Sequence, residues 1–529
     1  MSRTFQTAAT FCLILAALGP SEFAWAKGRG KTEKPLSLSE RVNHLLDRLS
    51  FGPRPEELEK ISARGEAGIW KWIEDQMNPA RLPDENLAEK LAKIPSLKMS
   101  ITELQKNYLN VQDFAKQKGI DPKNLTEDQK KEFRKEIGEE HLPERIVDEL
   151  TAQKLIRAIE GRKQLEEVLS DFWFNHFNVD INKGEDRYFV TAYEREAIRP
   201  HIFGKFRDML LATAKHPAML FYLDNFQSRA NGLNENYGRE LMELHTLGVD
   251  GGYTQDDVIQ VARALTGWSI DEPRKNAEFK FKEKIHDRGE KKILGVNFPA
   301  NGGIEEGEKV IDLLANHPST AKFIATKLVR YFVADEPPEK LVSRVAQRFL
   351  KTHGDLKQTY MEIFKSPEFW SRKYFANKIK PPFRYLVSSV RALGGEVETK
   401  TELTRYLNQL GEPLYRCPPP TGYKDVAEAW VNPGALVTRL NFGIALAANR
   451  INGVFVQLPH IEKPPHDPTA LVARIENKLL HARLSANSEK VVLKEFNLEG
   501  RVMADGEVRP LSLAKAVGLV IGSPEFQRR

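Results

Sequence analysis

Cysteine is almost absent from this sequence of 529 residues, which has only Cys12 and Cys417. Cys12 falls in an N-terminal segment that we expect to be removed, so Cys417 keeps no intrachain partner. The shortage excludes a fold stabilised by intrachain disulfides. It also excludes haem attachment, which needs a Cys-x-x-Cys-His motif. We therefore expect Cys417 to be a free thiol.

Long apolar runs are equally scarce. The first 26 residues combine Arg3, an apolar run over 11–18 and the small-x-small site Ala24-Trp25-Ala26, which is typical of a signal peptide. The lone Arg3 argues against twin-arginine export. No later stretch approaches the roughly 20 apolar residues of a membrane helix. We predict a signal peptide over 1–26, a mature chain starting near Lys27, and an exported protein, periplasmic or secreted, without an integral membrane span.

Several catalytic and binding signatures are also missing. No His-Glu-x-x-His, Gly-x-Ser-x-Gly or P-loop pattern occurs, which argues against zincins, serine hydrolases and nucleotide-binding enzymes. The net charge is +6, yet no Lys/Arg-rich tract is interleaved with aromatic residues. We therefore expect no nucleic-acid partner.

The composition and periodicity favour a large helical protein. Apolar residues make up 41% of the chain, ample for a large core. We predict an all-α fold, a large multi-helix body with helical hairpins and at most a small β-hairpin. The main body is expected over 27–451, with a charged excursion at 112–140. A C-terminal appendage with a closing helix is expected over 452–529.

The densest polar stretch, residues 234–268, is predicted to form a helix hairpin. Gly248 suits the left-handed residue that ends a helix. Thr254 and Asp257 have the spacing of a capping box at the start of the next helix.

Three polar residues of the first helix, Asn236, Glu240 and Glu243, share one face at positions i, i+4 and i+7. Two carboxylates one turn apart repel, so a proton, a cation or the arginines Arg239 and Arg263 should offset them. One reading is a salt-bridged network that fastens the hairpin; the other is a site that binds metal or substrate.

His176 lies on the apolar stripe of a helix predicted over 164–180, so its side chain is expected to point inward. Burial lowers the pKa of an imidazole, which suits a metal ligand, a general base or a structural hydrogen bond. Asn175 beside it slightly favours a functional role.

Two further segments carry candidate residues. Residues 279–281 alternate like a strand, and a β-hairpin turning at Asp287 to Gly289 fits the sequence that follows. His286 with Asp287 is either an imidazole held by a carboxylate or part of a plain turn. The proline-rich segment 417–423, leading to Trp430, is predicted to pack across the body; a groove for a sugar or peptide is the alternative.

Together these stretches resemble a bacterial family known as domain of unknown function 1800. The resemblance rests on 165–179 (LEEVLSDFWFNHFNV), 234–268, the H-D-x-G-x-K-x-x-L-G pattern of 286–295, and 418–430. It implies an exported protein, often encoded beside a second exported, sulfatase-like protein that is a candidate partner. It implies no activity.

We expect the His176 helix, the hairpin and the 286–295 turn to converge on a hydrolase- or lyase-type site. The candidate roles are His176 as base or ligand, Glu240 and Glu243 as acid/base pair or ligands, and Arg239 or Arg263 as anion stabiliser. The candidate binding residues are Asn175, Asn236, Arg263, Trp268, His286 and Asp287. The cofactor stays unknown, with a divalent metal possible. The alternative is a non-catalytic binding or assembly protein of the cell envelope that works with an exported partner.

Overall fold

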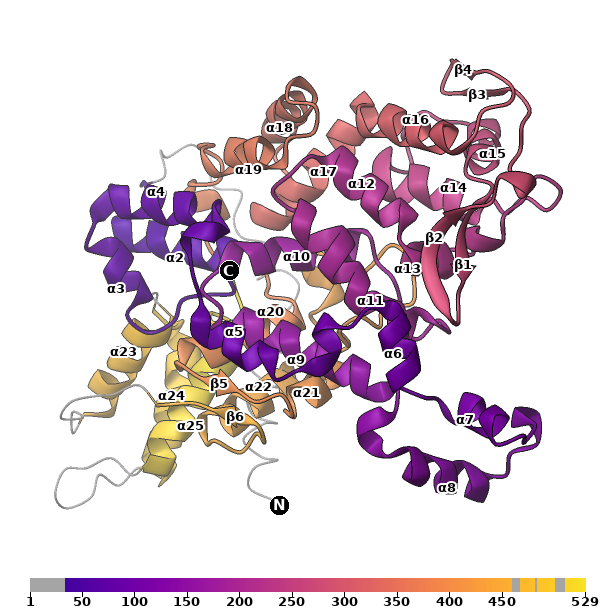
Figure 1. Ribbon diagram of the computed structural model, residues 1–529. Coiled ribbons are helices and arrows are strands. Elements are labelled where there is room, and N and C mark those ends of the chain that lie inside the picture. The colour runs from indigo at the N-terminus through magenta and orange to yellow at the C-terminus, as the bar shows by residue number, and fades with distance from the viewer. Residues whose placement is uncertain (1–33, 459–466, 481–482, 500–509) are drawn as a thin grey trace.

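The computed structural model describes residues 34–458, 467–480, 483–499 and 510–529. The predicted signal peptide over 1–26 and the start near Lys27 lie outside them. The described residues form 24 α-helices and three two-stranded sheets. The predicted all-α class is therefore confirmed, with small β-hairpins as additions (Figure 1). None of the helices in these ranges is long and apolar enough to cross a membrane.

The α-helices before the hairpin are α2 Leu38–Leu49, α3 Glu57–Ser62, α4 Gly65–Gln76, α5 Glu85–Ala92, α6 Ile101–Asn107, α7 Val111–Gln117, α8 Glu127–Ile137, α9 Glu144–Glu160, α10 Gln164–His176, α11 Asp186–Tyr193, α12 Phe206–Lys215 and α13 Pro217–Tyr222. Those from the hairpin onward are α14 Asn236–Glu240, α15 Gln255–Ala264, α16 Ile304–Ala315, α17 Pro318–Phe332, α18 Glu339–Lys351, α19 Leu356–Phe364, α20 Pro382–Ala392, α21 Leu403–Gln409, α22 Pro433–Ala447, α23 Pro468–Leu479, α24 Ala486–Glu499 and α25 Pro510–Gly522.

One hydrophobic core joins nearly all of these helices, and α9 and α10 run through its centre (Figure 1). Helix α9 is buried on most sides, because apolar residues such as Ile146, Leu150 and Leu155 cover more than one face. In α10, Leu165, Leu169 and Trp173 are fully buried along the predicted stripe. This rigid centre positions the polar residues at the end of α10.

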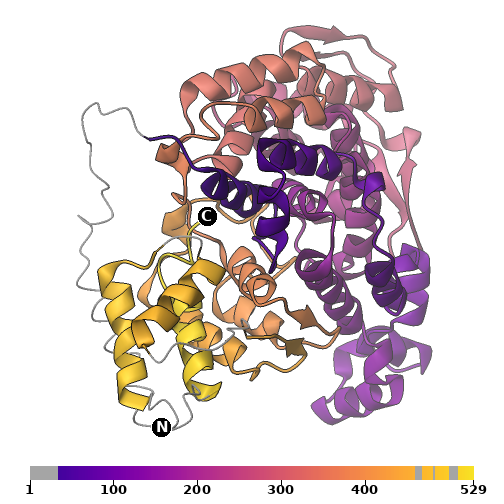
Figure 2. The same ribbon diagram turned by 90° about the vertical axis from the view of Figure 1, so that its left-hand side faces the viewer.

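The charged excursion at 112–140 is a pair of helices, α7 and α8, that projects from the body (Figures 1 and 2). It has a small hydrophobic cluster of its own, formed by Val111, Ala115, Leu125 and Phe133. At its base the backbone N–H of Leu109 donates to the carbonyl of His141 at 2.9 Å. The excursion is thus a satellite lobe with a closed neck.

The predicted helix hairpin is present, with one departure from a regular helix. Gly248 ends the first helix at φ 82°, and Thr254 and Asp257 form the predicted capping box before α15. After α14, however, residues Leu241–Thr246 form a π-helix, in which the N–H of Leu247 donates to the carbonyl of Met242 at 2.7 Å. The wider turn shifts the phase of later side chains relative to an α-helix.

The strands form three antiparallel pairs: β1 Trp268–Glu272 with β2 Asn276–Phe281, β3 Lys291–Ile293 with β4 Val296–Phe298, and β5 Glu396–Val397 with β6 Val454–Phe455. The strand predicted around 279–281 is confirmed. The turn predicted at Asp287 to Gly289 is wrong: the β3–β4 hairpin turns at Leu294 and Gly295, with φ 48° and 81°. Two consecutive positive φ angles suit a tight hairpin turn, whereas Asp287 is held by Arg263 and by the N–H of Gly289.

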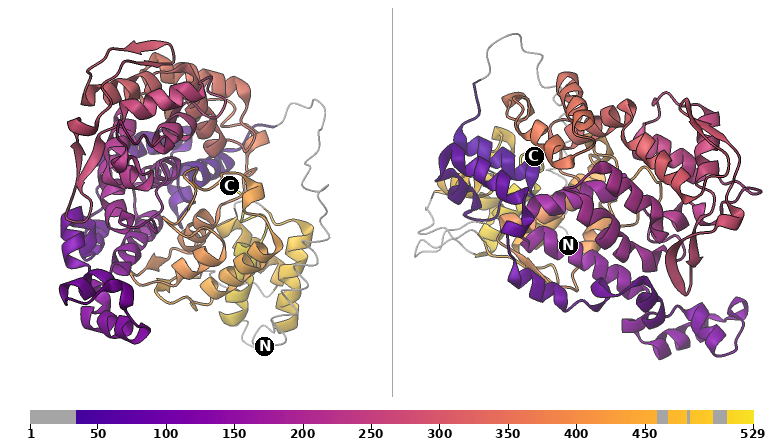
Figure 3. Two further views of the ribbon diagram at one scale, coloured as in Figure 1. Left: turned by 90° about the vertical axis from the view of Figure 1, so that its right-hand side faces the viewer. Right: turned by 45° about the horizontal axis from the view of Figure 1, so that its top comes forward.

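The described parts of 452–529 pack closely on the preceding body, with α25 against α22 (Figures 2 and 3). The last residues pair with the segment before α20: Lys378 and Arg529 exchange backbone hydrogen bonds of 3.2 and 2.8 Å, and the N–H of Lys380 donates to Gln527 at 2.8 Å. Arg529 is thereby placed in the interior, at 1% exposure. The domain boundary at 451 stays a prediction.

Candidate functional site

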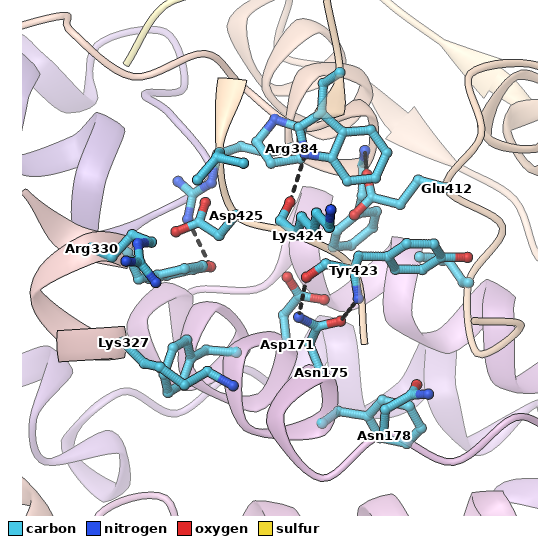
Figure 4. A pocket seen from close by; sticks show the side chains of 18 of the residues that line it. Asp171, Asn175, Asn178, Lys327, Arg330, Arg384, Glu412, Tyr423, Lys424 and Asp425 are labelled. Carbon is cyan, nitrogen blue, oxygen red and sulfur yellow. Dashed lines mark hydrogen bonds between the residues drawn. The ribbon is translucent and has the colours of Figure 1, made fainter. Parts of the chain in front are cut away.

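A cavity of about 350 Å³ opens between α10, α17, the start of α20 and the segment 412–430 (Figure 4). Its walls mix aromatic rings with charged groups. The aromatic residues are Phe172, Phe174, Tyr331, Phe383, Tyr415, Tyr423 and Trp430. The charged residues are Lys154, Lys327, Arg330, Arg384, Lys424 and Arg529, with the carboxylates Asp171, Glu412 and Asp425. Cations therefore outnumber carboxylates in the lining.

The segment 417–430 that sequence analysis singled out forms one wall of this cavity. Asn175, at the end of α10, holds it in place: its amide donates to the carbonyl of Tyr423 at 2.9 Å and accepts from the N–H of Tyr423 at 2.7 Å. Gly422 has φ 69°, and a Cβ there would lie 2.2 Å from the carbonyl oxygen of Asn175. Only glycine permits this approach. Of the predicted site residues, Asn175 is the one that lines the cavity.

Arg384 and Arg529 are buried in the wall, and the one ion pair that joins them to a carboxylate among the described residues is that of Arg529 with Asp425. Arg384 is 3% exposed and donates to the carbonyls of Asp47 at 2.9 Å and Ser50 at 2.5 Å. Arg529 reaches Asp425 at 3.3 Å, and its Nε and one terminal nitrogen find no hydrogen-bond partner among the described residues. Burial, followed by repulsion from Arg384, lowers the pKa of Arg529. Buried cations without full compensation are costly unless an anion joins them.

Lys327 projects from α17 into the cavity and contacts His176. The Lys327 amine donates to Nδ1 of His176 at 2.9 Å, while Nε2 of His176 lies 3.1 Å from the carbonyl of His245. The tautomer that fits both partners is neutral, with the proton on Nε2. Burial and the neighbouring Lys327 lower the pKa of His176 well below its usual value. Burial, and then Arg330, lower the pKa of Lys327 to about 8.

Glu412 enters the cavity from the opposite side to Lys327 (Figure 4). One of its oxygens accepts from the backbone N–H of Phe383 at 2.7 Å. The pKa of Glu412 is raised to about 8: burial raises it most, the Phe383 hydrogen bond lowers it in part, and Asp171 contributes a smaller increase. A carboxyl group that is protonated at neutral pH can donate a proton or a hydrogen bond to a ligand.

The predicted pair Glu240 and Glu243 lies on the hairpin and does not line this cavity. In the described part of the chain neither glutamate has a hydrogen bond or ion pair with His176, Arg239 or Arg263. Burial, and then Glu243, raise the pKa of Glu240. Arg239 instead contacts Glu235 at 3.4 Å and Gln255 at 2.9 Å.

Asn236, also predicted for the site, donates to the carbonyl of Leu223 at 3.3 Å. It is exposed on the hairpin surface.

The remaining candidates form a separate, tightly bonded cluster around the 286–295 loop. Arg263 donates twice to Asp287, at 3.0 and 2.9 Å. The carboxylate beside His286 is that of Glu306, at 3.2 Å, and not that of Asp287. Lys291 joins the cluster at 2.7 Å from Glu306. These bonds fasten the loop to α15 and α16, as in a structural ion-pair network.

Trp268 is fully buried against α16, where a Cβ on Gly307 would lie 2.4 Å from its ring. It contributes packing.

A metal site gains no support from this arrangement. Within residues 34–458, 467–480, 483–499 and 510–529, no group of three or more His, Cys, Asp or Glu side chains is placed to hold a metal ion. The charged groups that line the cavity are lysines, arginines and carboxyl groups.

Sequence reasoning missed the main residues of the cavity, although two had a local signal. Lys327 lies on the buried stripe of α17, three residues after Ile324 and four before Tyr331. Arg384 lies in α20, whose other residues are almost all buried. A cation on an apolar stripe can be read from sequence. Arg529 has no such signal, because its burial depends on pairing with a distant segment.

Comparison with known proteins adds a family and nothing more specific. No curated protein and no solved structure matches the chain. A family model described as "Protein of unknown function (DUF1800)" matches residues 44–528. This match covers nearly the whole chain, and it agrees with the resemblance of the hairpin, α10 and the cavity wall. The chain therefore belongs to the DUF1800 family.

Proposed function

We propose that this protein binds a small anionic molecule in the cavity and acts on it by hydrolase- or lyase-type acid–base chemistry. The observation that carries the proposal is the excess of cationic over carboxylate side chains in the wall. Arg529 is buried with two nitrogens unpartnered among the described residues, and its carboxylate partner there is Asp425. Guanidinium groups recognise carboxylates and phosphates through paired hydrogen bonds.

The acid–base part of the proposal rests on Lys327 and Glu412. A lysine whose pKa is about 8 is partly neutral near neutral pH and can accept a proton. A glutamate whose pKa is about 8 is largely protonated there and can donate one. We thus assign the hydrolase- or lyase-type chemistry to the cavity and no longer to the Glu240–Glu243 pair. His176 takes part by accepting a hydrogen bond from Lys327.

We also propose that the protein is exported and acts outside the cytoplasm. The signal-like residues 1–26 support export to the periplasm or the medium. The family resemblance suggests work beside an exported sulfatase-like protein. N-terminal sequencing of exported material tests the first point, because an intact Met1 contradicts it.

Anion binding is tested by thermal unfolding with inorganic phosphate, sulfate, acetate, pyruvate and glucuronate. Arg330→Gln is the informative variant, since Arg330 lines the cavity without being fully buried. We expect at least one anion to stabilise the protein saturably, with affinity about tenfold weaker in the variant. Lys322→Gln, which removes an exposed charge from the same helix, is the matched control. If no anion stabilises the protein, or if both variants behave like wild type, the proposal fails.

Lys327→Met separates binding from chemistry once a converted ligand is known. We expect it to retain binding and lose turnover. Binding without turnover in the wild-type protein would favour the non-catalytic alternative.

A further inference from the structure

The partly buried Lys327 differs from the buried lysines Lys154 and Lys378 in what its amine contacts. Lys154 pairs with Asp171 at 2.6 Å, and Lys378 pairs with Asp425 at 3.3 Å. Lys327 has no carboxylate within ion-pair distance among the described residues, and its hydrogen-bond partner is the His176 imidazole. A partly buried lysine whose amine is hydrogen-bonded to a neutral base is in an environment typical of nucleophilic lysines.

Arg330 stands one helical turn after Lys327 and lines the same side of the cavity (Figure 4). Its Nε donates to the carbonyl of Asp335 at 3.2 Å, and its terminal nitrogens have no partner among the described residues. Residues three apart on a helix have Cβ atoms about 5–6 Å apart. A carboxylate bound by Arg330 would thus bring a neighbouring carbon of the same molecule toward the Lys327 amine.

We propose that Lys327 forms an imine with an oxo acid, a molecule that carries both a carboxylate and a ketone or aldehyde carbonyl, whose carboxylate binds Arg330. This inference rests on the proposed function, because it names the substrate class and the nucleophile of the same cavity. It assigns Arg330 to binding the carboxylate and His176 to orienting the lysine amine through their hydrogen bond.

The chemistry balances without an oxidant, reductant or metal. The neutral amine nitrogen attacks the carbonyl carbon, a C–N bond forms, and the carbonyl oxygen becomes a hydroxyl. That oxygen then leaves as water, its two hydrogens being those that the amine loses, and a C=N bond remains. With a pKa of about 8, the Lys327 ammonium loses its first proton to solvent near neutral pH, and Nδ1 of His176 orients the amine by accepting its hydrogen bond.

Reductive trapping tests the inference directly. The purified protein is incubated with pyruvate, the smallest stable oxo acid, and with sodium cyanoborohydride, and the modified lysines are then mapped by peptide mass spectrometry. We expect labelling of Lys327 at least about tenfold above that of exposed Lys322 on the same helix, because the Lys327 amine has a pKa of about 8 and stands beside the carboxylate-binding Arg330. Lys327→Arg should abolish the label there. Arg330→Gln should reduce it, and acetone, which lacks the carboxylate, should label Lys327 far less than pyruvate.

The outcomes separate this inference from the proposed function. If pyruvate stabilises the protein against thermal unfolding but Lys327 is labelled no faster than Lys322, the imine is refuted and anion binding stands. Equal labelling by acetone and pyruvate would refute the role of Arg330. If no anion binds and no label appears, both proposals fail.

Discussion

At the scale of single residues, the cavity is defined by ionisable groups whose pKa values are shifted by burial. Glu412 offers the clearest test, because its pKa is about 8 in the folded protein and 4.5 is its ordinary value. Between those pH values the folded state binds one more proton than the unfolded state, so stability falls as pH rises.

Glu412→Gln should remove this loss of stability. Glutamine resembles the protonated acid and can still accept from the N–H of Phe383. We expect midpoints similar to wild type near pH 4.5 and higher by about 1–2 °C at pH 8, measured by thermal unfolding. Glu428→Gln, at an exposed position in the same segment, should leave the pH profile unchanged. An unaltered profile in Glu412→Gln would show that the carboxyl is ionised at neutral pH.

Cys417 should react slowly with thiol reagents in the folded protein. It is buried at 3% exposure, and burial raises the pKa of its thiol to about 11. The thiolate is the reactive form, so we expect the native reaction at pH 7.5 to be roughly a hundredfold slower than in urea-unfolded protein. Non-reducing gels should show monomer. A disulfide-linked dimer would instead make Cys417 an assembly residue.

Glu240→Gln distinguishes the hairpin from the cavity as the functional site. Burial and Glu243 both disfavour the charged form of Glu240, and no described residue pairs with it. The variant should therefore keep or raise its thermal midpoint, by about 1 °C, while anion binding stays unchanged. Loss of binding or turnover in this variant would show that the functional site lies at the hairpin.

At the scale of elements, close packing between α16 and β1 depends on Gly307. A Cβ there would lie 2.4 Å from the buried Trp268 ring. Gly307→Ala should therefore destabilise the protein by about 1–3 kcal/mol through overpacking, measured by urea unfolding. In Gly434→Ala, the nearest atom to the new methyl is Asn432 Oδ1 at 3.4 Å, so no loss is expected. Equal stability of the two variants would contradict the packing described for α16.

The elements also show how far sequence reasoning reaches. The capping box of Thr254, the stop at Gly248 and the buried stripe of α10 follow from neighbouring residues, and all three were predicted. The π-helix after α14 and the turn at Leu294 and Gly295 were not, because tertiary contacts such as Arg263 with Asp287 select among local options. The cavity was missed for the same reason, because its residues come from distant segments. Only Asn175 and the segment 417–430 were singled out beforehand.

At the scale of the whole molecule, the α7–α8 lobe should be dispensable for folding. Its cluster of four apolar residues is separate from the main core, and a hydrogen bond between Leu109 and His141 closes its neck. Replacing residues 111–139 by a short Gly-Ser linker should shift the thermal midpoint by less than about 2 °C and leave anion binding intact. Circular dichroism and thermal unfolding measure this. Loss of cooperative unfolding would show that the lobe supports the body.

The backbone pairing of Arg529 with Lys378 determines when, during synthesis of the chain, the wall of the cavity can be completed. The cavity draws its wall from Lys154 at one extreme and Arg529 at the other. At roughly 5–20 residues per second, a ribosome needs on the order of 20–75 s to add the chain between them. For most of that interval the residues of α9 and α10 have already been added, while Arg529, whose guanidinium group completes the wall, has not. An anion held in part by Arg529 can therefore bind only after that residue has been added, well after the residues of α9 and α10.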